Sequence, residues 1–197
     1  MISKGVLQKL YQNQGKSAQE IANIFECSVN KIRYWMEKYS ITCRSISEAI
    51  YKKNNPNGDP FVIKYPHTLK EGILYGFGLG LYWGEGTKAD KCTVRLGNTD
   101  PRLVKKFIDF LVKFFSIRRK DLKFSLQLFN DISVTEALRF WKGQIKVNKN
   151  QFYKSTITMS VRKGTYREKS RHGVLTVYYH NKKMRDELMR ILENKKN

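Results

Sequence analysis

Apolar residues in the first part of the chain recur at helical spacing in three short stretches. Residues 4–12 carry apolar side chains three and four positions apart, which predicts a helix. Ser17 and Glu20 have the spacing of a capping box that opens a second helix. The pattern breaks at Glu26, and Ser28 is placed to cap a third helix. The predicted inner faces consist of Val6, Leu7, Leu10, Ile21, Ala22, Phe25, Val29, Ile32, Trp35, Met36 and Tyr39.

Helical and strand periods alternate in the rest of the chain. In chain order we expect a helix over 69–84, a strand over 91–97, a helix beginning at Pro101, a strand over 122–129, a helix opened by Ser133, strands over 155–163 and 173–180, and a closing helix over 181–194. Asp100 is a predicted N-cap, and Ser133 with Glu136 is a second predicted capping box. This order predicts an α+β domain in which an antiparallel sheet has helices on one face.

A stretch of turn-forming residues separates the two patterns. Three of the four prolines lie in 54–66, together with asparagine and glycine, and such a composition interrupts regular structure. We therefore expect a small all-α module over 1–50, a linker over 51–68 and the α+β domain over 69–197.

The charge of the chain indicates a polyanionic partner. It has 38 lysine and arginine residues against 17 acidic ones, a formal net charge of +21, and nucleic acid is the commonest partner of such proteins. No apolar run reaches the roughly 18 residues of a membrane span, so we do not expect a membrane as partner. We also do not expect a small-molecule substrate. The three cysteines lie far apart, which favours a reducing compartment and a cytoplasmic, nucleoid-associated protein.

The predicted strands have one apolar and one polar face. The inward sets are Cys92, Val94 and Leu96, then Leu122, Phe124, Leu126 and Leu128, then Ile157, Met159 and Val161. The outward sets are Lys91, Thr93 and Arg95, then Lys123, Ser125 and Gln127, then Thr156, Thr158, Ser160 and Arg162. The outward sets combine hydroxyls, an amide and cations without a carboxylate, as readout of a DNA groove by strands requires.

The three N-terminal helices resemble a helix-turn-helix module, in which two short helices joined by a tight turn follow a first helix. The predicted outer face of the last helix offers Asn30, Lys31, Arg33 and Tyr34, side chains that can contact bases or phosphates in a major groove. An ordinary three-helix bundle with a polar surface is the alternative interpretation.

The segment 76–86 is unusually rich in glycine for a predicted helix. Each glycine inside a helix costs about 1 kcal/mol relative to alanine, so the cluster needs an offsetting contact. Gly76, Gly80 and Gly84 recur every four residues and form a bare stripe that another helix could approach closely. The spacing matches neither the dinucleotide-binding nor the P-loop pattern.

The residues Gly78-Leu79-Gly80-Leu81-Tyr82-Trp83-Gly84-Glu85-Gly86 resemble the LAGLIDADG motif of homing endonucleases, in the variant that ends Gly-Glu-Gly. The element order that follows resembles the αββαββα order of that family over about 69–194. Single-motif chains with an N-terminal helix-turn-helix are known, so the resemblance extends to the whole chain.

The resemblance implies roles for particular residues. The glycine helices of two motifs pack together in the family, which matches Gly80 and Gly84 here. The acidic residue near the end of the motif binds a divalent metal, usually Mg²⁺, and this position is Glu85. The earlier acidic position is Trp83 in this chain, a departure that weakens the case for catalysis. Lys88 is a further catalytic candidate on residue type alone.

Three functions follow from these observations. The first is a sequence-specific endonuclease that cuts double-stranded DNA as a homodimer, with one Glu85 from each subunit and Mg²⁺ as cofactor. The second is a DNA-binding transcription regulator that keeps the fold without cutting, which Trp83 and the helix-turn-helix favour. The third is an RNA-binding protein of the maturase type. The chain contains one motif copy, so pairing of the glycine stripe requires a second subunit.

Overall fold

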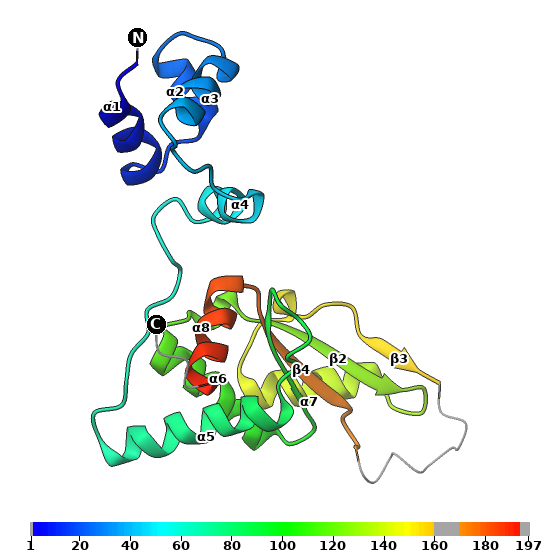
Figure 1. Ribbon diagram of the computed structural model, residues 1–197. Helices are drawn as coiled ribbons and strands as arrows, with labels where there is room; N and C mark the ends of the chain where they lie inside the picture. The colour runs from blue at the N-terminus through cyan, green and yellow to red at the C-terminus, as the bar shows by residue number, and fades with distance from the viewer. Residues whose placement is uncertain (1, 160–169, 194–197) are drawn as a thin grey trace. The chain divides into compact units, whose positions relative to one another are not determined.

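The computed structural model describes residues 2–159 and 170–193, and the chain divides into two compact units, Met1–Pro60 and Phe61–Asn197 (Figure 1). The first unit consists of α1 (Lys4–Gln8), the π-helical turn η1 (Lys9–Asn13), α2 (Ala18–Ile24), α3 (Val29–Lys38) and α4 (Ile46–Asn54). Its separate core is formed by Ile2, Leu7, Tyr11, Ile21, Ala22, Ile32, Met36 and Ile41.

The predicted caps of the first unit are confirmed. The Ser17 side chain accepts from the Glu20 N–H while the Glu20 carboxylate accepts from the Ser17 N–H, which is a complete capping box. Ser28 caps α3 by accepting from the N–H of Lys31. These bonds satisfy amide groups that have no partner within the helix.

Helix α4 was absent from the sequence prediction. A capping box between Ser45 and Glu48 opens it, and none of its residues is buried. It continues to Asn54, whereas the predicted module ended at residue 50 and the predicted linker began at residue 51. The compact units divide after Pro60.

The second unit contains one sheet and four α-helices in the described residues. These are α5 (Leu69–Glu85), β1 (Val94–Asn98), α6 (Pro101–Phe115), the 3₁₀ turn η2 (Arg119–Asp121), β2 (Lys123–Phe129), α7 (Val134–Ile145), the 3₁₀ turn η3 (Lys149–Gln151), β3 (Thr156–Thr158), β4 (Val174–Tyr179) and α8 (Lys182–Leu192). The α+β class is therefore confirmed.

The prediction of a purely antiparallel sheet is wrong. The strand order is β1-β4-β2-β3, and β4 pairs antiparallel with β1 and β2, but β2 pairs parallel with β3. The crossover through α7 accounts for the parallel pair, because a helical connection returns the chain in its original direction. The element order from α5 is αβαβαββα rather than strictly αββαββα.

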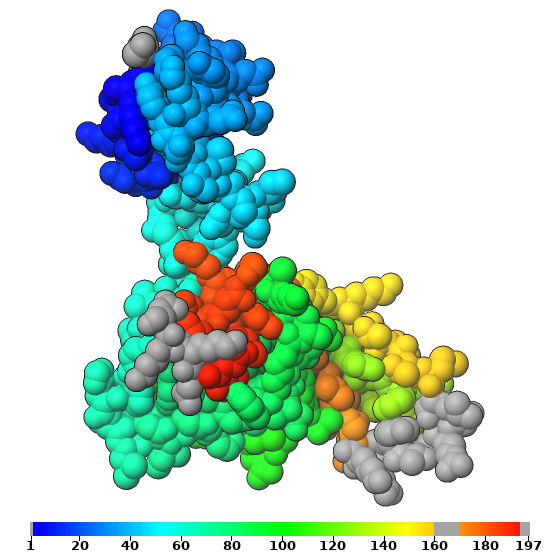
Figure 2. Space-filling view, in the orientation of Figure 1, coloured from blue at the N-terminus to red at the C-terminus, as the bar shows by residue number. Residues whose placement is uncertain are grey.

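The core of the second unit lies between the inner face of the sheet and the helices. Helix α6 contributes Val104, Phe107, Ile108, Phe110, Leu111, Phe114 and Phe115, all buried. The inner face of β2 contributes Phe124, Leu126 and Leu128, with at most 1% exposure, as predicted. Helix α8 adds Met184 and Leu188 to the same core, and part of the helix is visible in orange and red beside the green segments of this unit (Figure 2).

Candidate nucleic-acid interface and metal ligand

In the N-terminal unit, helix α3 follows helix α2 closely along the chain. The turn between α2 and α3 is short, and Glu26 within it takes a left-handed conformation with φ of 47°. Ile32 and Met36 bury one face of α3. The opposite side presents the four predicted DNA-contacting side chains to solvent, namely Asn30, Lys31, Arg33 and Tyr34.

The pairing register arranges the outer face of the sheet in rows across the strands. They contain Arg95, Tyr178 and Lys123; then Gly97, Thr176 and Ser125; then Val174, Gln127 and Thr156; and then Phe129 and Thr158. None of these positions carries a carboxylate. The rows therefore bring six strand residues predicted to bind DNA onto one surface, namely Arg95, Lys123, Ser125, Gln127, Thr156 and Thr158.

Two predicted faces need correction. Thr93 was predicted to point outward but is only 5% exposed, and Cys92 was predicted to point inward but is exposed. Both residues lie before β1 beside the exposed Lys91, where the alternation of a strand does not apply. Ile157 and Met159 were predicted to point into the core, yet they are 46% and 76% exposed, because β3 is an edge strand of three residues that the helices cover incompletely. Predicted contacts Ser160 and Arg162, and the inward Val161, lie outside the described residues.

Sequence reasoning missed an aromatic cluster at one end of the outer face. The rings of Tyr178 and His180 stack with their centroids 5.8 Å apart, and the Tyr153 ring stands edge-on to Tyr178 at 5.8 Å. The Tyr153 hydroxyl lies 2.8 Å from His180 Nε2, and the Thr93 hydroxyl lies 3.2 Å from His180 Nδ1. Alternation along 173–180 could have placed Tyr178 and His180 on one face, but Tyr153 precedes its strand and gave no signal.

The predicted glycine stripe of α5 is open. A Cβ added at Gly76, Gly80 or Gly84 would meet no atom of the described residues within 4 Å, and the same holds at Gly72, one turn earlier. The exposed apolar side chains on this helix are Leu69, Ile73, Phe77 and Trp83, with exposed fractions of 82%, 65%, 42% and 58%. An apolar helix surface of this kind is typical of an interaction site.

The C-terminal end of α5 is packed against α6 through Tyr82. Tyr82 is fully buried and its ring stacks on Phe107 with the centroids 6.1 Å apart. Burial raises the pKa of the Tyr82 hydroxyl. Because Tyr82 fixes the last turn, the next helical positions, including Glu85, are held at the surface.

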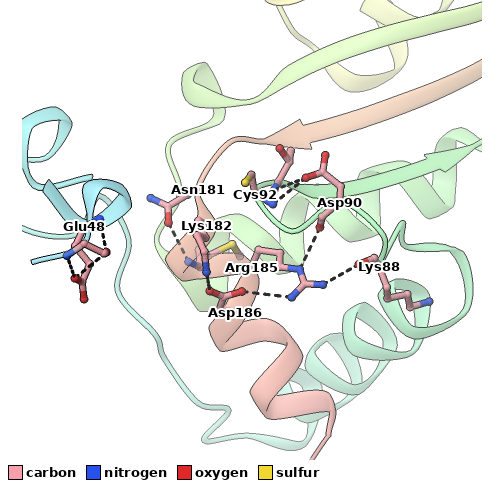
Figure 3. Close-up of polar contacts among 11 residues, drawn as sticks. Glu48, Lys88, Asp90, Cys92, Asn181, Lys182, Arg185 and Asp186 are labelled. Carbon is pink, nitrogen blue, oxygen red and sulfur yellow. Dashed lines mark hydrogen bonds and ion pairs between the residues drawn. The ribbon is translucent and has the colours of Figure 1, made fainter. Parts of the chain in front are cut away.

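The loop that follows α5 is tied to α8. The Arg185 guanidinium donates to the carbonyl oxygens of Lys88, at 2.8 Å, and Asp90, at 3.2 Å (Figure 3). The Asp90 carboxylate in turn accepts from the N–H groups of Cys92 and Thr93. The start of this loop contacts β1, because the Thr87 N–H donates to the Arg95 carbonyl at 2.9 Å.

The two predicted catalytic residues lie at the same end of α5. Glu85 is exposed as the last residue of the helix, and the Lys88 ammonium group donates to the carbonyl oxygen of Trp83. A carboxylate at a helix C-terminus, where the backbone carbonyls carry partial negative charge, is a suitable ligand for a hard cation. In the part of the chain that the structure describes, no group of three His, Cys, Asp or Glu side chains could hold a metal ion. Glu85 by itself offers one carboxylate, which is fewer oxygen ligands than a hard cation takes.

Comparison of the chain with protein-family models, curated proteins and solved structures finds no match. Among the described residues, no helix is both long and apolar enough to cross a membrane. The class that the fold defines is a mixed α+β domain joined to a small helical unit. The relation to LAGLIDADG proteins stays a prediction from the residues of 78–86.

Proposed function

We propose that the protein binds double-stranded DNA through the outer face of its sheet and cuts it as a homodimer, with Mg²⁺ bound by Glu85 of both subunits. The observation that carries the proposal is the chemistry of the outer face, where Arg95 and Lys123 accompany hydroxyl and amide groups and no paired position is acidic. Cations contact phosphates, and polar side chains contact base edges.

The N-terminal unit supplies a second DNA contact in this proposal. Asn30, Lys31, Arg33 and Tyr34 all lie on the exposed side of α3, the helix that follows the turn. In helix-turn-helix proteins this second helix enters the major groove. A second contact lengthens the recognised site.

The open stripe on α5 supports the homodimer. Two copies of this helix can approach closely along Gly76, Gly80 and Gly84, because no side chain in the described part of the chain occupies the space above them. A two-fold contact of this patch with itself brings the two Glu85 carboxylates to a shared position. A bound Mg²⁺ would polarise the phosphate and lower the pKa of an attacking water molecule.

Charge reversal tests the outer face directly. Lys123→Glu places a carboxylate on the outer face, and we expect a large loss of DNA affinity and a salt-dependence slope that is smaller by about 1. Lys106→Glu, on the exposed side of α6, makes the same charge change on the helical side of the sheet and serves as the matched control. Equal losses for both variants would mean that net charge alone drives binding and would contradict the proposal.

Glu85→Gln separates cutting from binding. The variant keeps the shape of the side chain, so we expect DNA affinity within a few-fold of the original and loss of Mg²⁺-dependent cleavage. Glu136→Gln, an exposed acid in the first turn of α7, is the control and should still cut. Unchanged cleavage by the Glu85 variant would remove this residue from the proposed site.

The second candidate function is a DNA-binding regulator that does not cut. Two observations favour it: Trp83 occupies the earlier acidic position of the motif, and the Lys88 ammonium bonds to the Trp83 carbonyl within three residues of Glu85. The cleavage assay distinguishes the candidates, because a regulator binds the same DNA and leaves it intact with Mg²⁺ present.

A further inference from the structure

Arg95 lies against an aromatic ring on the outer face of the sheet. Its Cζ atom is 5.2 Å from the centroid of the Tyr178 ring, which belongs to the residue paired with it across β1 and β4. The Arg95 guanidinium forms no hydrogen bond or ion pair with any other residue in 2–159 or 170–193. A cation–π contact of this kind restricts the side chain and leaves its N–H donors available.

The ring that supports Arg95 is itself held in place. His180 stacks on Tyr178 with an interplanar angle of 17°, and Tyr153 packs edge-on at 81°. His180 is fixed in turn through both ring nitrogens, by the hydroxyls of Tyr153 and of the buried Thr93. The chain of contacts runs from the buried end of β1 to the surface, so Tyr178 cannot turn away without breaking it.

A fixed guanidinium suits one kind of ligand in particular. Arginine binds the O6 and N7 atoms of guanine through two parallel hydrogen bonds, and this is the commonest specific contact in the major groove. The contact requires orientation, whereas a phosphate is also bound well by a lysine ammonium group, which acts as a point charge. Lys123 at the other end of the row carries such a group, which donates to the Asn150 carbonyl at 3.4 Å. An aromatic support for Arg95 alone therefore favours base readout at this position.

We propose that Tyr178 is a positioning residue that holds the Arg95 guanidinium for two-bond readout of a guanine in the major groove. The inference rests on the proposed function, because it requires the outer face to bind double-stranded DNA. It adds a specific base and three residues, Tyr153, Tyr178 and His180, that act through Arg95.

The test is a base-resolved preference profile, obtained by selecting a randomised duplex library with the full chain without Mg²⁺. Arg95→Ala should abolish a guanine preference of about 5- to 150-fold at one position of each half-site and leave other positions unchanged. Tyr178→Leu should reduce the same preference about 2- to 5-fold, the size expected of an exposed cation–π contact. Tyr178→Phe keeps the ring and should match the original protein.

A double-mutant cycle separates positioning from a general structural role. Once Arg95 is alanine, Tyr178→Leu should change the profile no further, because the two residues act on one base. A uniform loss of affinity with Arg95→Ala, at all positions alike, would identify a phosphate contact and overturn the inference. So would a Tyr178→Leu profile that changes elsewhere or not at all. Absence of DNA binding by the original protein would instead overturn the proposed function itself.

Discussion

Two glycines of α5 separated by one residue meet opposite surroundings. A Cβ at Gly78 would lie 2.1 Å from Phe110 Cγ and 2.6 Å from Phe110 Cβ, whereas a Cβ at Gly80 would meet nothing within 4 Å. Gly78 is therefore needed for the contact between α5 and α6 inside one chain. Among the described residues Gly80 has no such contact, and the space beside it is open.

Alanine at these two positions should have opposite effects. Gly78→Ala should lower the free energy of unfolding by about 1–3 kcal/mol, because the new methyl group displaces Phe110 from a packed core. Gly80→Ala should raise the intrinsic stability of the helix by roughly 0.5–1 kcal/mol. Urea denaturation at a protein concentration below dimer formation measures both. A Gly78→Ala protein as stable as the original would contradict the described contact with α6.

The ionisation of Glu71 at the start of α5 makes the stability of the fold depend on pH. Its carboxylate accepts from the His67 N–H at 2.9 Å and pairs with Lys113 at 2.9 Å, and these contacts lower its pKa from 4.5 to about 2. Because the folded-state pKa is the lower one, the stabilisation is fully present above pH 4.5 and is lost as the pH falls toward 2.

The pH dependence of unfolding should therefore change in Glu71→Gln. We expect the variant to be less stable than the original at neutral pH and to lose less stability between pH 4.5 and about 2. Urea midpoints over this range measure the difference, with Glu136→Gln as the control. Parallel pH profiles for the original and the Glu71 variant would show that this carboxylate does not couple folding to protonation.

Among the helices and strands, the features that could be predicted from the sequence are those that depend only on residues close together in the chain. Capping at Ser17, Ser28 and Asp100 relies on bonds within three positions, and all three caps are present. The parallel pairing of β2 with β3 could not be predicted, because it depends on where the crossover through α7 returns the chain. The exposure of Ile157 could not be predicted either, because β3 lies at the edge of the sheet and an alternating sequence pattern does not distinguish edge strands from central ones.

In the candidate site, too, local features could be predicted from the sequence and contacts between distant residues could not. Arg95, Lys123, Ser125 and Gln127 could be placed on one face because alternation in a strand is local. Thr93 could not, because its burial depends on His180, which is far away in the sequence.

The boundary between the units gives an expectation for truncation. Residues 61–197 contain a complete core of their own, so the fragment should fold, with a melting transition close to that of the larger unit in the full chain. It should bind DNA more weakly and protect a shorter stretch in a footprinting assay. A footprint of unchanged length would mean that the N-terminal unit does not contact DNA.

At the scale of the whole molecule, the open stripe of α5 predicts the oligomeric state. Gly80→Leu should convert a dimer to a monomer, because the side chain separates the two helix backbones. Gly143→Leu is the matched control, since Gly143 is also a helix glycine with nothing within 4 Å and lies in α7. Sedimentation velocity at micromolar concentration, with and without DNA, measures the change. A monomeric original protein in both conditions would exclude the homodimer.

We propose that the outer sheet face and α3 together read double-stranded DNA, which the dimer then cuts at Glu85. The most direct test exposes the full chain to a randomised duplex library with Mg²⁺ and reads both the enriched sequences and the new ends. We expect enrichment of an inverted repeat with cuts near its centre, and with Glu85→Gln the same enrichment without cuts. Failure of the original protein to enrich any duplex sequence would contradict the proposal.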